Sequence, residues 1–82
     1  MSPRVSVILP THDRPALLQE ALASLQAQTF GDWEAVVVDD ASDPPVRNDW
    51  GDARVRVVRH EAARGGAAAK NSGIAQARGE VV

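Results

Sequence analysis

With 82 residues the chain is at most one small domain, and its formal net charge of -2 argues against a nucleic-acid-binding module, which usually carries a basic face. The absence of cysteine excludes disulfides and cysteine-based metal sites. No apolar stretch approaches the roughly 20 residues that span a bilayer, and the amino terminus lacks the apolar core of a signal peptide, so we expect a cytoplasmic protein without a membrane segment.

The first half of the chain predicts a strand, a helix and a second strand. Residues Arg4–Leu9 are mostly apolar and β-branched, and they predict a buried strand that Pro10 ends, because proline cannot donate to a sheet. A helix should follow to about Gln28, with Asp13 as its N-cap. Its apolar residues recur at the helical spacing i, i+3, i+4, i+7 and form a stripe of Leu18, Ala21, Leu22 and Leu25. Trp33–Val38 predicts the second strand.

The second half continues the alternation of strands and helices. Ala41–Ala53 is rich in proline and aspartate and predicts a surface connection, whereas Arg54–Arg59 alternates valine with arginine, which favours a strand at an edge or in a half-exposed position. Ala67–Ala77 is a small-residue helix that Gly79 is expected to stop, and Glu80–Val82 opens a fourth strand. The element order predicts an α/β fold with a Rossmann-like parallel sheet and flanking helices.

The most informative segment is VVVDDAS, Val36–Ser42, in which an apolar run ends abruptly on Asp39 and Asp40. Such a run is typical of a strand buried on both faces, as in a parallel sheet. Open α/β sheets bind their ligands at the carboxyl ends of the strands, where carboxylates can accept hydrogen bonds or help to hold a metal. One of the two could equally cap the turn that follows, because Asp-Ala-Ser suits a turn.

Several chemistries are disfavoured by the loops. A dinucleotide-binding fold needs GxGxxG after its first strand, where this chain has PTHDRP, and the chain contains no GxxxxGK[ST] phosphate loop. The acidic pair follows the second strand, whereas a phosphoacceptor receiver domain needs it after the first. His12 and His60 are too few and too scattered for a metal site, and we expect each to be a loop histidine. No Ser–His–Asp arrangement is apparent.

Three polar segments are expected to converge at the carboxyl edge of the sheet: Pro10–Arg14, Asp39–Ser42, and the helix start from Gly65 and Gly66 to Lys70. Their contents suit a nucleotide. An Asp can pair with a ring N–H of a base, a helix amino terminus favours an anionic phosphate, and Lys70 adds positive charge. Taken singly, the two glycines could be only a flexible turn and the lysine only a solvated side chain.

These segments closely resemble the amino-terminal part of family 2 glycosyltransferases, which have the GT-A fold. The matching stretches are, in the family's order, VSVILPTHDR, a helix ending in QAQTF, VVDDAS and AAAKNSGIAQARGE. The resemblance covers essentially the whole chain and implies a partial GT-A fold. It also implies transfer of a sugar from a nucleoside-diphosphate donor, usually UDP-linked, to an acceptor that the sequence does not identify.

The resemblance implies roles for individual residues. Asp40 would accept a hydrogen bond from the uracil ring, with Asp39 beside it shaping the pocket. His12 stands where the family often has an aromatic residue and could stack on the base. Lys70, near base or phosphate, stands where arginine is common, which keeps the charge but loses the bidentate fork. The base and ribose would also contact Pro10 and Thr11, and close approach of the backbone would be allowed by Gly65 and Gly66.

The family's metal-binding DxD motif follows the fourth strand. The resemblance therefore implies that residues 1–82 are the nucleotide-binding part of a domain truncated before that motif, with no catalytic residue and no metal ligand of its own. A divalent Mn or Mg is expected in the complete enzyme, and the fragment alone should be inactive. A non-catalytic nucleotide-binding module and a self-associating α/β module remain alternatives. We also expect a homo-oligomer, because the stub Glu80–Val82 leaves an unpaired edge on the first strand.

Overall fold

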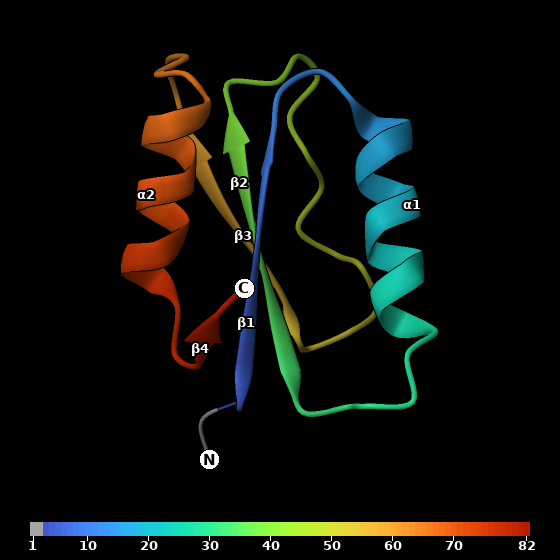
Figure 1. The fold of residues 1–82 in the computed structure, drawn as a ribbon. Coiled ribbons are helices and arrows are strands. Elements are labelled where there is room, and N and C mark those ends of the chain that lie inside the picture. The colour runs from blue at the N-terminus through green and yellow to red at the C-terminus, as the bar shows by residue number, and fades with distance from the viewer. Residues whose placement is uncertain (1–2) are drawn as a thin grey trace.

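The computed structural model describes residues 3–82, which form one parallel sheet with a helix on each face (Figure 1). The elements in chain order are β1 (Val5–Thr11), α1 (Pro15–Gln26), β2 (Trp33–Asp40), β3 (Val55–His60), α2 (Gly66–Gln76) and β4 (Glu80–Val81). The strands lie in the order β3-β2-β1-β4, and every neighbouring pair is parallel. The predicted Rossmann-like α/β fold with flanking helices is therefore confirmed, and β3 is the edge strand that its alternating arginines predicted.

The core is built on β2, whose eight residues are all buried. Successive side chains of a strand point to opposite faces, so this apolar run supplies both layers of the core. Ala35 and Val37 pack with Leu22 on the α1 face, whereas Val36 and Val38 pack on the α2 face. The two helices therefore hold β2 from opposite sides, as Figure 1 shows, and its last residues emerge at the carboxyl edge.

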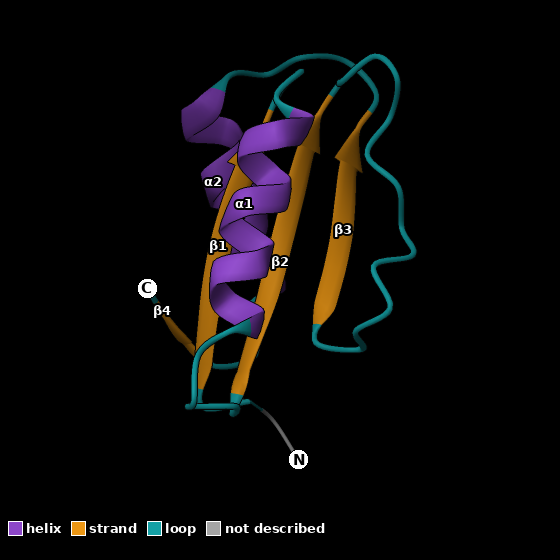
Figure 2. Cartoon of the chain, turned by 90° about the vertical axis from the view of Figure 1, so that its right-hand side faces the viewer, coloured by secondary structure: helices purple, strands orange, loops and turns teal. Residues whose placement is uncertain are grey.

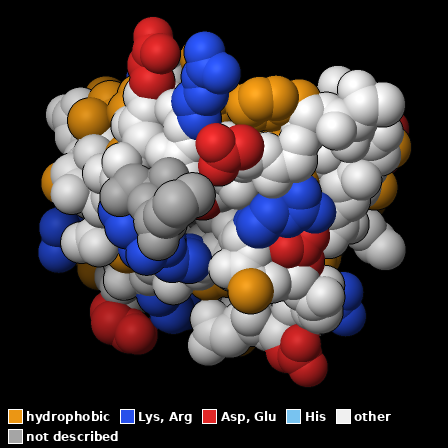
Figure 3. Space-filling view, turned by 90° about the horizontal axis from the view of Figure 1, so that it is seen from below, with side chains coloured by type: hydrophobic (Ala, Val, Ile, Leu, Met, Phe, Trp, Pro, Cys, Tyr) orange, Lys and Arg blue, Asp and Glu red, His pale blue; other side chains and the backbone are white. Residues whose placement is uncertain are grey.

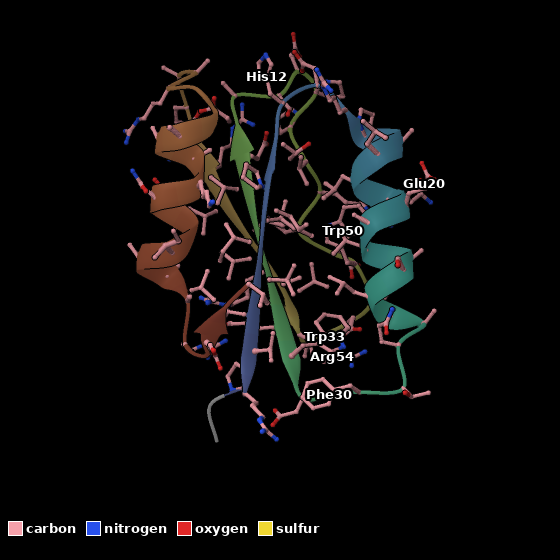
Figure 4. All side chains as sticks on the ribbon, in the orientation of Figure 1. His12, Glu20, Phe30, Trp33, Trp50 and Arg54 are labelled. Atoms are coloured by element: carbon pink, nitrogen blue, oxygen red, sulfur yellow. The ribbon has the colours of Figure 1, made fainter. Side chains whose placement is uncertain are left out.

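The long connection from residue 41 to residue 54 completes the cover of the α1 face. Figure 2 shows α1 lying over β1 and β2 while this connection runs on the β3 side. Trp50 packs against the core cluster, and the guanidinium of Arg47 lies 4.4 Å from the centroid of its ring. Farther down the same face, Arg54 stacks on Trp33 at 3.9 Å (Figure 4). The connection is thus a packed layer, which fixes the loop that leaves Asp39 and Asp40.

The prediction that Pro10 ends the first strand is wrong. β1 continues through Pro10 to Thr11, and Pro10 lies in register with Val38 of β2. Among the described residues, β4 pairs only with Val5 and Ser6, so at Pro10 the other side of β1 has no neighbouring strand. A proline is tolerated on such an edge because no ladder hydrogen bond is lost there. The longer strand carries Pro10 and Thr11 up to the carboxyl edge.

The predicted helix caps also differ from those observed. Arg14 occupies the N-cap of α1 without a side-chain bond, and Asp13 instead has a φ of 51° and accepts a hydrogen bond from the Asp43 backbone N–H at 2.7 Å. Asp13 therefore ties the first loop to the connection after β2. The C-cap of α2 is Ala77, two residues before Gly79. A Cβ at Gly79 would lie 2.6 Å from the Pro3 carbonyl oxygen, so that glycine permits a close chain crossing.

A buried carboxylate holds the end of α2 against the sheet. Glu34 of β2 accepts hydrogen bonds from Ser6 Oγ at 2.6 Å, from Arg56 Nη2 at 2.9 Å and from the Arg78 backbone N–H at 2.7 Å. Burial by itself raises the pKa of Glu34, but the bonds from Ser6, Arg78 and Arg56 outweigh it and lower the pKa from 4.5 to about 2. Sequence reasoning missed this group, although a lone acidic residue inside an apolar strand is a signal for it.

Figure 3 shows the molecule from below relative to Figure 1. On this face acidic and basic side chains lie side by side, and no large area of one charge is visible. Among residues 3–82, no helix combines the length and the apolar character that crossing a membrane requires.

Candidate functional site

A hollow of about 440 Å³ lies at the carboxyl edge of the sheet, between the end of β1, the first turns of α1 and the start of α2. Its polar lining comes from loops and strand ends, and its apolar wall includes Leu17 and Leu18 of α1. The structure brings five of the eight residues expected from the sequence to this hollow, namely Pro10, Thr11, His12, Asp40 and Gly66. Arg14, the last residue of the expected segment Pro10–Arg14, also lines it, although the sequence assigned it no role of its own.

The other three expected residues lie outside the hollow. Asp39 points to the opposite face of the sheet, toward the connection that follows β2. Gly65 lies beside the hollow, where its N–H donates to Asp40 Oδ2 at 2.9 Å. Lys70 is exposed on α2, one turn after the helix start, and does not line the hollow.

Asp39 anchors the connection and its edge strand. Its Oδ1 accepts from the Ser42 N–H at 2.9 Å, and its Oδ2 accepts from the Val46 N–H at 3.0 Å and from the guanidinium of Arg59. The residue is fully buried. Burial raises the pKa of Asp39, but the hydrogen bonds, led by that of Ser42, outweigh it and leave the pKa below its usual value. Asp39 thus performs the turn capping that the sequence left open, with Arg59 as an additional partner.

Asp40 lies on the α2 face and binds three donors. Its Oδ1 accepts from His60 Nδ1 and from the Arg64 N–H, both at 2.9 Å, and its Oδ2 accepts from the Gly65 N–H at 2.9 Å. The Arg64 N–H, followed by the His60 side chain, lowers the pKa of Asp40 from 3.8 to about 2, so the group is a carboxylate at neutral pH. A carboxylate has about four lone-pair positions. Donors within residues 3–82 use three of them, and the fourth remains on Oδ2.

His60 is not the loop histidine that the sequence suggested. It ends β3, directly opposite Asp40 in the β2–β3 register, and it is buried. Its Nε2 lies 2.8 Å from Ser72 Oγ of α2, so an Asp40–His60–Ser72 chain exists that sequence reasoning missed. The connectivity is that of a nucleophilic triad. Ser72 lies inside α2 and does not line the hollow, so these three hydrogen-bonded residues present no nucleophile to a ligand there.

His12 lies above the strand ends at the rim of the hollow (Figure 4). Its Nδ1 contacts the backbone carbonyl oxygen of Asp40, and its Nε2 lies 3.2 Å from Asp13 Oδ2. Its side chain is 53% exposed, so the ring is accessible to a ligand. This arrangement is compatible with stacking on a planar ring.

The start of α2 is an uncapped helix terminus beside Asp40. Gly65 is its N-cap with a φ of 90°, no side chain caps it, and its first turn contains no acidic residue. The first intrahelical bond runs from the Ala69 N–H to the Gly65 carbonyl oxygen at 3.0 Å, so the preceding N–H groups of the helix have no intrahelical partner. Such groups favour an anion. There is open space beside Gly66, because a Cβ added to this residue would meet no neighbouring atom within 4 Å.

A divalent metal does not fit the described side chains. Within residues 3–82, no group of three or more His, Cys, Asp or Glu residues is placed to hold a metal ion. The chemistry that these residues offer is therefore hydrogen bonding to a base, contact with a planar ring and attraction of an anion.

Comparison with known proteins identifies the family to which this site belongs. The family model for glycosyl transferase family 2 matches residues 6–82. The O-antigen biosynthesis protein RfbC of Myxococcus xanthus is 37% identical over an alignment of 87 positions, which covers 98% of this chain and 7% of RfbC. The Escherichia coli UDP-Glc:alpha-D-GlcNAc-diphosphoundecaprenol beta-1,3-glucosyltransferase WfgD is 30% identical over an alignment of 81 positions, which covers 95% of this chain and 32% of WfgD. The chain thus spans no more than about a third of either relative's length.

A solved structure supports the same assignment. The mannosyltransferase PcManGT from Pyrobaculum calidifontis, in complex with GDP-Man and Mn2+, matches with a TM-score of 0.74 and 28% sequence identity. The match covers 94% of this chain and 25% of PcManGT. The architecture described above is therefore the fold of part of a GT-A enzyme. Since the family model covers nearly the whole sequence, this chain belongs to the family 2 glycosyltransferases.

Proposed function

We propose that this chain supplies the nucleotide-binding part of a glycosyltransferase that transfers a sugar from a nucleoside-diphosphate donor, with UDP as the nucleotide. The observation that carries the proposal is that Asp40 lines a hollow between a polar strand end and an uncapped helix start and keeps one acceptor position that none of the described residues uses. WfgD is named for a UDP-linked donor and PcManGT is bound to a GDP-linked one. Both nucleotides therefore belong in the test.

The base is expected to be chosen by hydrogen-bond polarity. Uracil and guanine each carry a ring N–H next to a carbonyl group, and an ionised carboxylate can only accept a hydrogen bond. Cytosine and adenine present an acceptor nitrogen at the corresponding position, which Asp40 would repel. A pocket whose buried polar group is left unpaired by the wrong ligand discriminates strongly against it. Asp40 should therefore favour UDP or GDP over CDP or ADP.

The diphosphate is expected to lie toward the helix start. The free N–H groups near Gly66 and the positive end of the helix dipole favour an anion, and Arg14 lines the same hollow. Lys70 adds a further positive charge one turn along α2. We propose no step through a metal, because the described residues do not fit one. A Mn- or Mg-binding motif outside these residues stays part of the proposal for the whole enzyme, as does the inactivity of this chain alone.

The experiment is a calorimetric titration of the chain with UDP, GDP, CDP and ADP, repeated with Asp40→Asn. The wild type should bind UDP at least about tenfold more tightly than CDP, the value of one charged hydrogen bond. Asp40→Asn should weaken UDP binding by about tenfold and reduce the preference over CDP, because the amide can donate to cytosine. The ratio of the UDP affinity to the CDP affinity distinguishes two causes. A lost base contact changes this ratio, whereas a loosened Arg64–Gly65 turn would weaken the binding of both nucleotides.

The matched control is Asp32→Asn, which removes the same charge from an exposed residue just before β2, at the opposite end of the strand. It should leave both affinities unchanged. An identical UDP-to-CDP ratio in the wild type and in Asp40→Asn would remove Asp40 from base recognition. Failure of the wild type to bind any of the four nucleotides would overturn the proposed function.

A further inference from the structure

His60 is fixed at both ends of its ring by three different elements. It ends β3 in register with Asp40 of β2, so both side chains stand on the α2 face of the sheet. Its Nδ1 lies 2.9 Å from Asp40 Oδ1, and its Nε2 lies 2.8 Å from Ser72 Oγ. The ring is buried, with 5% of its surface exposed. A ring held in this way has neither the space nor the free nitrogen to serve a ligand directly.

The contacts of Ser72 and Asp40 together determine which ring nitrogen carries the hydrogen. The Asp40 carboxylate can only accept, so Nδ1 must donate to it. In the neutral ring Nε2 is then an acceptor, and the Ser72 hydroxyl can donate to it. Ser72 therefore holds the Nδ1–H form of His60 from within α2, on the side of the ring away from Asp40.

The contact of His60 with Asp40 decides which carboxylate oxygen stays free. With His60 present, Oδ1 has two donors, and Oδ2 has only the Gly65 N–H among the residues that the structure describes. Without His60, Oδ1 would also have a free position, and only the Arg64 and Gly65 N–H groups would hold the orientation of the carboxylate. A group whose rotation is locked before the ligand arrives binds more tightly, because less freedom is lost on binding.

We propose that His60 is a positioning residue of the nucleotide site, which saturates Asp40 Oδ1 and leaves Oδ2 as the one acceptor for the base, with Ser72 fixing the tautomer of His60. The inference rests on the proposed function, because it concerns how Asp40 recognises the base. It assigns affinity for UDP to two side chains that do not line the hollow.

The experiment compares UDP affinity and thermal stability in four proteins, and the ¹⁵N signals of the His60 ring in the two that keep it, the wild type and Ser72→Ala. His60→Phe removes both ring contacts and should weaken UDP binding about tenfold, the value of a hydrogen bond to a charged group. His60→Asn keeps a donor near Nδ1 and should recover most of that loss. Ser72→Ala leaves His60 and its contact with Asp40 in place and should weaken binding by about threefold, while the ¹⁵N shift of Nε2 should report the loss of the hydrogen bond from the Ser72 hydroxyl.

A double-mutant cycle shows whether His60 acts through Asp40. In an Asp40→Asn background, His60→Phe should cause little further loss of UDP affinity, because the group that it positions is already gone. Should His60→Phe fail to fold, Ser72→Ala carries the test, since alanine is favoured inside a helix. Unchanged UDP affinity in a folded His60→Phe or Ser72→Ala protein, or fully additive effects in the cycle, overturns this inference alone. A wild type that binds no nucleotide overturns the proposed function, and this inference with it.

Discussion

Two adjacent carboxylates at the end of β2 do different work because the strand sends them to opposite faces. Asp39 faces α1 and the connection, where the Ser42 and Val46 N–H groups and Arg59 use both of its oxygens. Asp40 faces α2 and keeps one position free. Asp39 is therefore expected to matter for stability, and Asp40 for binding.

Asp39→Asn should lower the free energy of unfolding by about 2–3 kcal/mol, because the amide presents a donor to groups that are themselves donors and removes the buried charge that pairs with Arg59. Urea unfolding at neutral pH measures the loss. Asp32→Asn, with the same change of charge at an exposed position, should stay within about 0.5 kcal/mol of the wild type. A similarly small effect at Asp39 would mean that the connection is held by Trp50 and its packing instead.

At the residue scale the sequence predicts where Asp39 and Asp40 lie, but not that the two carboxylates have different roles. The position follows from an apolar run that ends on two polar residues, which is a local signal. The partners of Asp40 lie 20 to 25 residues away, at His60, Arg64 and Gly65. Their approach depends on the β2–β3 register, which no local pattern specifies. The same holds for Ser72, whose contact with His60 needs α2 to be docked on the sheet.

At the scale of elements, the apolar patterns predicted the helices and strands well, because hydrophobic periodicity reflects burial. Predictions from turn chemistry were less successful. Pro10 stays inside β1, and Asp13 bonds Asp43 instead of capping α1. Both residues lie where another segment of the chain supplies or removes a hydrogen-bond partner. The role of Glu34 as a buried hydrogen-bond acceptor was not predicted for the same reason, since its donors come from β1, β3 and the turn after α2.

The carboxylate of Glu34 should make the packing of α2 and β4 sensitive to acid. The folded-state pKa values of Glu34 and Asp40 are both about 2, below the 4.5 and 3.8 expected without partners. A lowered pKa contributes stability that is present above the unfolded value and is lost as the pH falls toward the folded one. We therefore expect the unfolding temperature to decline between pH 4.5 and about 2.

Circular dichroism during heating at several pH values between 7 and 2 measures this decline. Glu34→Gln should be less stable at neutral pH by about 2 kcal/mol and should lose less on acidification, because one of the titrating groups is gone. Equal unfolding temperatures for the wild type at pH 5 and pH 2.5 would show that these carboxylates add little to the stability of the fold.

At the scale of the whole molecule, β1 has two very different edges. Along its full length it pairs with β2, but on its other side only Val5 and Ser6 have a partner among residues 3–82. The hollow lies along the upper part of that open side, with Leu17 on its wall. Leu17 is 56% exposed and Val82, next to the short β4, is 71% exposed. An open strand edge flanked by apolar side chains is a template for pairing with another strand.

A polypeptide of residues 1–82 should therefore self-associate through this edge, most simply as a symmetric dimer, since a small core gains most from burying such a surface. Light scattering after size exclusion, at roughly 10–100 μM, measures the mass. Leu17→Glu places a charge on the wall of the hollow and should shift the chain toward monomer. Phe30→Glu, at an exposed residue beyond the opposite end of α1, should not. Because the same hollow is proposed to bind UDP, the nucleotide should also favour the monomer. A wild type that is monomeric throughout this range, with or without UDP, would mean that the open side of β1 resists strand pairing by itself.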